Sequence, residues 1–269
     1  MLIGNVQGRF LPSPKNRLQF FPKRKWRDEF ELAKSIGYNF IEFFSERIYD
    51  KENPIWNNNL LLEYKNLCKK NNLRIITFCD DYIISNDIRK SDYQNYYKKL
   101  ISKCDKLGIK KLILPLYGRS NLNYKNYNEF IIPLFKLDKI SKSKKIKLLI
   151  ETNLDKSNLI QLFNSVNSNN LKLLFDTGNR ITNPLNNYND ISSLFRIIDH
   201  IHIKDKTINN KNVIIGEGDV DFNIIFKNLK NINYNKDFTF ETNKGKDPIK
   251  TSINNLKFIK KMIFKYNLV

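Results

Sequence analysis

The sequence lacks the features that would place it in a membrane or in an oxidising compartment. No apolar run approaches the length of a membrane span, and the apolar start, residues 1–6, is too short for a signal peptide and has no cleavage site. The three cysteines, Cys68, Cys79 and Cys104, are scattered without metal-ligand spacing, which is typical of reduced thiols. We therefore expect a cytoplasmic protein without a membrane partner.

The chain also lacks a glycine-rich nucleotide loop. No GxGxxG pattern follows the first expected strand, and Gly216-Glu217-Gly218 comes too late and is too short to replace it. This absence argues against an open dinucleotide-binding sheet.

Charge of one sign is in excess, with a formal net charge of +20. Such a charge raises nucleic acid or an anionic substrate as a partner, because a basic surface concentrates polyanions. The lysines are spread along the whole chain, however, often as pairs on expected helices. We favour an overall compositional bias and expect no nucleic-acid partner.

Apolar runs and amphipathic segments alternate along all 269 residues. Because most runs are continuously apolar, they indicate strands of a parallel sheet that is covered on both faces. The expected strands are residues 2–6, 39–43, 73–79, 110–115, 146–151, 170–176, 198–204 and 237–241. Eight such units in one domain, residues 1–269, most economically close as a (β/α)₈ TIM barrel.

Helical periodicity fills the intervals between these strands. One apolar stripe begins at Trp26 and ends before Gly37, and another ends before Gly108. Further helices are expected over residues 57–71, 126–143, 155–168, 188–197, 220–229 and 247–265, with Asp155 and Asp221 as helix N-caps. The irregular segment 7–23 is expected to be a lid or an active-site loop.

Four expected strands in the second half of the chain carry a residue that can bind a metal. Glu151, Asp176 and Glu241 end apolar runs, and His202 lies on the strand between the last two. A carboxylate at the edge of an apolar core must be solvated, paired or metal-bound. Active-site groups of a barrel gather at the carboxyl ends of its strands. We therefore expect these four residues to hold one divalent metal ion.

The strand over 198–204 determines which histidine faces the metal. His200, His202 and Lys204 share parity and point to one face. If that face is the lumen, His202 lies nearer the mouth than His200, which we expect to be structural. Three carboxylates and an imidazole favour Mn²⁺ first, and then Mg²⁺, Co²⁺ or Zn²⁺.

Several short motifs stand at or after the expected strands of the second half: Ile150-Glu151-Thr152-Asn153, Phe175-Asp176-Thr177-Gly178-Asn179, His200-Ile201-His202-Ile203-Lys204-Asp205, Gly216-Glu217-Gly218-Asp219-Val220-Asp221-Phe222 and Phe240-Glu241. In these motifs the chain resembles the xylose-isomerase-like TIM barrel superfamily, and specifically its sugar phosphate isomerase/epimerase family. The family includes ketose 3-epimerases, hydroxypyruvate isomerase, inosose dehydratase and, more remotely, endonuclease IV. The resemblance covers nearly the whole chain.

The resemblance implies a metal-dependent isomerase or epimerase acting on a sugar or sugar derivative through proton abstraction and an enediolate. It assigns the acid/base roles to Glu151 and Glu241. Related barrels often pair, so a homodimer is a further expectation. Many members carry a substrate-binding histidine three residues after the strand-six aspartate, where this chain has Asn179. Asparagine can hydrogen-bond an oxygen but cannot carry charge near neutral pH.

The remaining candidates for substrate binding follow other strands. Gln7 and Arg9 follow the first strand, and Arg9 is either a ligand for a phosphate or carboxylate or an ordinary surface arginine. Glu42 ends the second strand and either binds a substrate hydroxyl or forms a salt bridge. Lys204 either binds substrate or pairs with Asp205. The expected substrate-binding set is Gln7, Arg9, Glu42, Asn179 and Lys204.

The alternative function is an endonuclease IV-like DNA-repair nuclease on the same barrel. Endonuclease IV uses a histidine-rich three-zinc cluster, whereas this sequence holds only His200 and His202. The histidine count therefore favours the sugar isomerase or epimerase.

Overall fold

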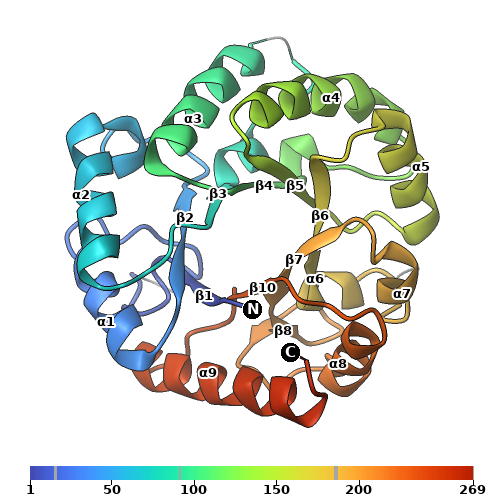
Figure 1. Ribbon diagram of the computed structural model, residues 1–269. Helices are drawn as coiled ribbons and strands as arrows, with labels where there is room; N and C mark the ends of the chain where they lie inside the picture. The colour runs from blue at the N-terminus through green and yellow to red at the C-terminus, as the bar shows by residue number, and fades with distance from the viewer. Residues whose placement is uncertain (15–16, 91, 185–186, 269) are drawn as a thin grey trace.

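The predicted strands close into a barrel in the computed structural model, which describes residues 1–14, 17–90, 92–184 and 187–268. Within these residues, eight parallel strands pair in the closed order β1-β10-β7-β6-β5-β4-β3-β2, and helices surround them (Figure 1). The predicted (β/α)₈ barrel in a single domain is confirmed. Among the same residues, no helix is both long enough and apolar enough to cross a membrane.

The barrel strands are short and buried. They are β1 Ile3–Val6, β2 Phe40–Ser45, β3 Thr77–Asp80, β4 Lys111–Pro115, β5 Lys147–Glu151, β6 Leu171–Asp176, β7 Ile198–Ile203 and β10 Asp237–Phe240. Every residue of β2 and of β7 is buried. Because both faces of the strands are covered, apolar residues can follow one another without alternation, as Leu148, Leu149 and Ile150 do in β5.

The helices form the outer ring, in which α9 lies between α1 and α8 (Figure 1). The described α-helices are α1 Asp28–Ile36, α2 Asn58–Lys70, α3 Tyr93–Leu107, α4 Tyr127–Ser143, α5 Lys156–Val166, α6 Thr177–Ile181, α7 Asp190–Leu194, α8 Phe222–Asn231 and α9 Pro248–Lys265. Three short 3₁₀ helices are described as well, at Pro54–Trp56, Asp81–Ser85 and Gly118–Ser120.

The predicted helix boundaries have the expected chemistry. Gly37 and Gly108 end α1 and α3 with φ angles of 101° and 96°, in the left-handed region that glycine adopts at low cost. Asp155 accepts a hydrogen bond from the Asn158 backbone N–H, and Asp221 accepts one from that of Ile224. Each carboxylate thus satisfies a backbone donor that the first helical turn leaves free.

The structure differs from the sequence-based prediction at several points. β3 begins at Thr77 rather than at residue 73, because only Arg74 of the preceding segment bridges to Phe40 before the ladder with β2 begins. The predicted helix over 188–197 is reduced to α7. The sequence did not predict α6, nor the antiparallel ribbon of β8 (Asp205–Lys206) and β9 (Asn212–Val213) that follows β7.

Candidate metal centre

Four neighbouring strands deliver the four predicted metal ligands to one rim of the barrel. Glu151 is the last residue of β5 and Asp176 is the last of β6. His202 pairs in register with Asp176 on one side and with Thr239 of β10 on the other. Glu241 directly follows β10. Since all the strands are parallel, their carboxyl ends meet at the same rim.

The side chains of these four residues converge. One carboxylate oxygen or imidazole nitrogen from each of Glu151, Asp176, His202 and Glu241 lies within 4.8 Å of the other three. His202 Nδ1 is 3.3 Å from Glu241 Oε2 and 3.9 Å from Glu151 Oε2. His202 Nδ1 is buried but makes no hydrogen bond to a described residue. A buried imidazole nitrogen that faces carboxylates without a hydrogen bond to them suits a site for a shared cation.

Lys204 is a cationic partner of this cluster. Its Nζ lies 2.6 Å from Glu241 Oε2 and 3.0 Å from Asp176 Oδ2. The lysine stem passes over Gly178, where an added Cβ would lie 2.8 Å from Lys204 Cγ. Asp205, the partner of Lys204 in the alternative interpretation, instead accepts hydrogen bonds from the backbone of Gly216 and Gly218.

The protein environment shifts the pKa values of two carboxylates in opposite directions. Burial, together with the charges of Asp176 and Glu241, raises the pKa of Glu151 to about 8. Burial acts on Glu241 as well, but Lys204, His202 and Arg9 hold the pKa of its carboxyl well below the usual value. A bound divalent cation would relieve the repulsion between Glu151 and the carboxylates of Asp176 and Glu241.

Two further residues contact Glu151. Asn179 Nδ2 donates to Glu151 Oε1 at 2.7 Å, and the Tyr117 hydroxyl donates to the same oxygen at 3.2 Å. Asp176 Oδ1 accepts from the backbone N–H groups of Gly178 and Asn179, so it also caps α6. Asp176, at the end of β6, therefore positions Asn179, and Asn179 in turn contacts Glu151 at the end of β5.

A cavity of about 1530 Å³ opens above the cluster. Its lining includes Glu151, His202 and Glu241 from the cluster, together with Arg9, Glu42, Asn179 and Lys204 from the predicted substrate-binding set. Most described residues of the predicted loop 7–23 also line it; residues 15 and 16 lie outside the described residues. The loop thus forms part of the cavity wall.

Arg9 is buried rather than an ordinary surface arginine. Only 2% of its surface is exposed, and its Nη2 donates to Gln19 Oε1 and lies 3.9 Å from Glu241 Oε1. The backbone beside it is fastened by Glu29, which accepts from the Gly8 N–H, and by Lys244, which donates to the carbonyls of Gly8 and Leu11. These contacts hold the guanidinium next to the cluster.

Gln7 occupies a different position from the rest of the predicted substrate-binding set. Its side chain is fully buried and accepts a hydrogen bond from the Tyr64 hydroxyl at 3.1 Å. It does not belong to the described residues that line the cavity. This location favours a role in holding the loop rather than contact with a substrate.

The sequence carries no signal for Tyr117, and it places Asp80 and Asp81 directly after the expected strand 73–79, where either could line a cavity or form a turn. The structure separates the two aspartates. Asp80 accepts hydrogen bonds from Tyr96 and Tyr97 in the core, whereas Asp81 lines the cavity. Burial and the charge of Glu241 raise the pKa of Asp81 to about 7. The only available signal for Asp81 was its place at the end of an expected strand.

Comparison of the fold with solved structures identifies several sugar epimerases. D-allulose 3-epimerase from Methylomonas sp. has 17% identity and a TM-score of 0.75, over 97% of this chain and 98% of that chain. D-psicose 3-epimerase from Clostridium cellulolyticum H10, solved with D-tagatose, has 13% identity and a TM-score of 0.78, over 98% and 99%. The IOLI protein with a binding zinc atom has 16% identity and a TM-score of 0.73, over 99% and 98%. At these identities the likeness shows the fold alone.

Comparison of the sequence gives a family but no individual relative. No protein of curated function matches it significantly. A family model described as xylose isomerase-like TIM barrel matches residues 30–262, which is most of the chain and includes all four residues of the cluster. The chain therefore belongs to the xylose isomerase-like TIM barrel family.

Proposed function

We propose that the protein is a divalent-metal-dependent isomerase or epimerase that acts on a sugar or sugar derivative. The convergence of Glu151, Asp176, His202 and Glu241 within 4.8 Å at the floor of a large cavity carries this proposal. The epimerases of similar fold act on ketoses according to their names, which supports a small sugar as the partner.

In this proposal the same four residues are the metal ligands. Three carboxylates and one imidazole suit Mn²⁺ best, with Mg²⁺, Co²⁺ and Zn²⁺ as alternatives. The zinc atom in the IOLI protein shows that a barrel of similar fold holds a divalent ion. When bound here, the ion would supply Lewis acidity beside a substrate carbonyl and so acidify the adjacent C–H bond.

Glu151 and Glu241 are the proposed acid/base pair. Each has one oxygen near His202 Nδ1, at 3.9 Å for Glu151 Oε2 and 3.3 Å for Glu241 Oε2. The second oxygen of each faces elsewhere: Glu151 Oε1 faces Tyr117 and Asn179, and Glu241 Oε1 faces Arg9. This division lets a carboxylate hold a ligand position with one oxygen and exchange a proton through the other.

Two outcomes are open to the enediolate that deprotonation produces. If one glutamate removes the proton and the other returns one to the opposite face of the same carbon, that carbon is inverted. If the proton returns to the neighbouring carbon, the carbonyl moves. Each proton transfer of this kind contributes about 10²–10⁴ to the rate.

Arg9, Asn179 and Lys204 are the proposed substrate contacts, because each lines the cavity within reach of a cluster carboxylate. Arg9 offers charged donors for a substrate oxygen, and Asn179 offers an uncharged amide in place of a histidine. A homodimer and a cytoplasmic location remain predictions from the sequence.

The test is proton exchange in D₂O. The metal-free protein and the protein loaded with Mn²⁺ are incubated with a panel of ketoses and sugar phosphates, and deuterium incorporation is followed by NMR. We expect metal-dependent labelling of one carbon in at least one sugar. Binding of Mn²⁺ without labelling of any sugar in the panel would count against the proposal.

The nuclease alternative gains no support from the site. Both histidines of the sequence lie on β7, and His200 contacts Thr239 in the barrel interior. A nicking assay on DNA containing abasic sites separates the two functions, and we expect no nicking with any of the four metals.

A further inference from the structure

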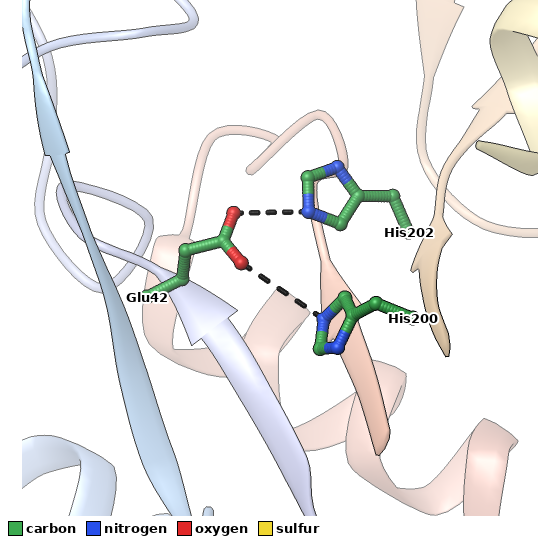
Figure 2. A group of neighbouring side chains, drawn as sticks. All are labelled: Glu42, His200 and His202. Carbon is green, nitrogen blue, oxygen red and sulfur yellow. Dashed lines mark ion pairs between the residues drawn. The ribbon is translucent and has the colours of Figure 1, made fainter. Parts of the chain in front are cut away.

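Glu42 lies inside the barrel, opposite the two histidines of β7, and its carboxylate faces both rings (Figure 2). Glu42 Oε1 is 2.9 Å from His202 Nε2, and Glu42 Oε2 is 3.9 Å from His200 Nε2. None of the three side chains is more than 1% exposed. A buried carboxylate is costly unless its partners compensate it, so this arrangement calls for a reason.

The two ring nitrogens of His202 face different groups. Nδ1 faces the carboxylates of Glu241 and Glu151, whereas Nε2 faces Glu42. A neutral imidazole carries one N–H, and the partner of one nitrogen sets the state of the other. In the neutral ring that binds a metal, a carboxylate beside Nε2 would hold the single proton there and leave the Nδ1 lone pair for the ion.

Glu42 is itself held in place from the side away from the cluster. The Thr239 hydroxyl donates to Glu42 Oε2 at 3.3 Å, and the same hydroxyl lies 2.7 Å from His200 Nε2. The His200 ring packs edge-on against Phe40, with ring centroids 6.3 Å apart. Thr239, His200 and Phe40 thus fix the carboxylate that faces His202.

Two other roles for Glu42 fit the geometry less well. Glu42 lines the cavity, but its side chain is fully buried and both of its oxygens face side chains within the barrel, which leaves little room for a substrate hydroxyl. Glu42, His200 and His202 could also hold a second metal, but that ion would have to displace the Thr239 hydroxyl from His200 Nε2. Both roles predict results different from those expected below.

We propose that Glu42 is a positioning residue for the metal centre: it fixes the ring orientation and the tautomer of His202, so that Nδ1 is the nitrogen that binds the ion. The inference rests on the proposed function, because it requires that His202 is a metal ligand. Hydrogen-bond partners behind a metal-binding histidine typically contribute about 10–100-fold to metal affinity.

The test compares Glu42→Gln and Glu42→Leu with the unaltered protein. Glutamine keeps the shape and an acceptor oxygen but loses the charge, whereas leucine loses the acceptor. Asp138→Asn on α4 is the matched control, because it neutralises a buried carboxylate that is bonded to Asn170, on the outer side of the barrel away from the cluster. Mn²⁺ affinity is measured by EPR of the free ion, and the coordination is followed by the visible spectrum of bound Co²⁺.

We expect Mn²⁺ affinity to fall about 10–100-fold in Glu42→Leu, less in Glu42→Gln and not at all in Asp138→Asn. The Co²⁺ spectrum should change only in the two Glu42 variants, and KM at saturating metal should stay constant in Glu42→Gln. Metal-free melting temperatures, measured in EDTA, show whether each variant folds.

Three results would overturn the inference. If one Mn²⁺ binds to both Glu42 variants with unaltered affinity, Glu42 does not position His202. If KM rises at saturating metal while affinity is unchanged, Glu42 contacts the substrate. If the unaltered protein binds two ions and the Glu42 variants bind one, Glu42 is a ligand. A protein that binds no metal at all would instead overturn the proposed function, and the inference with it.

Discussion

Lys204 and Glu241 form an ion pair at the barrel mouth, with Lys204 Nζ 2.6 Å from Glu241 Oε2; Lys204 is buried and Glu241 is partly exposed. The same ammonium lies 3.0 Å from Asp176 Oδ2. Lys204 therefore neutralises part of the negative charge of the cluster from within. A divalent ion bound as proposed would share these two carboxylates with the ammonium. The ion pair would then link the stability of the metal-free protein to metal binding.

Replacing Lys204 by glutamine should lower the melting temperature in EDTA and increase the rise in melting temperature that Mn²⁺ produces. The reason is that three close carboxylates lose their nearest cation, and the dication then relieves more repulsion. Thermal unfolding with EDTA and with Mn²⁺ measures both effects. Lys206→Gln is the control, because Lys206 is also a buried cation of the cavity wall but bonds to Asn210. Equal Mn²⁺ responses in the two variants would refute this link.

Replacing Asp176 by asparagine should weaken Mn²⁺ binding by about an order of magnitude or more while leaving the fold intact. Asparagine is as good an N-cap as aspartate, so the hydrogen bonds to the N–H groups of Gly178 and Asn179 can remain. The variant thus removes a charged ligand without removing the cap of α6. Isothermal titration calorimetry measures the affinity; an unaltered value would show that Asp176 is not a ligand.

Replacing Glu241 or Glu151 by glutamine should reduce sugar turnover by at least about 10²-fold, because each variant loses one proton-transfer group. Deuterium exchange at saturating Mn²⁺ separates this loss from weaker metal binding. Tyr117→Phe removes a hydrogen bond to Glu151 but no acid/base group, so its loss should be smaller. A glutamine variant that retains full exchange would remove that glutamate from the acid/base pair.

The stability of the metal-free protein should fall as pH rises, partly because of Glu29. Burial raises the pKa of Glu29 from 4.5 to about 8, so between these values the folded state keeps a proton that the unfolded state releases. Its contribution to the free energy of unfolding is full below about pH 4.5 and is lost as pH rises to about 8. Urea unfolding in EDTA should show a weaker pH dependence for Glu29→Gln; parallel curves would contradict this assignment.

The sequence predicted the features that depend on strand ends. Glu151 and Asp176 could be found because each closes a continuous apolar run. His202 could be found because it shares a face with His200 but lies nearer the carboxyl end of β7. Tyr117 could not be found, because its hydroxyl reaches Glu151 only through the pairing of β4 with β5. The burial of Arg9 could not be predicted either, because it depends on contacts with distant segments. The helix α6 was missed because it is a single short turn after Asp176.

Lys244 holds the loop after β1 at the place where the first and last strands of the barrel pair. Lys244, just beyond β10, donates to carbonyls that follow β1, and β1 pairs directly with β10. Arg9 and Glu241 therefore meet only when the last strand docks beside the first. A chain without β10 and the residues that follow it would lack Glu241 and the contacts of Lys244, so the four-residue cluster would be incomplete. Closing the ring and completing the site are thus one event.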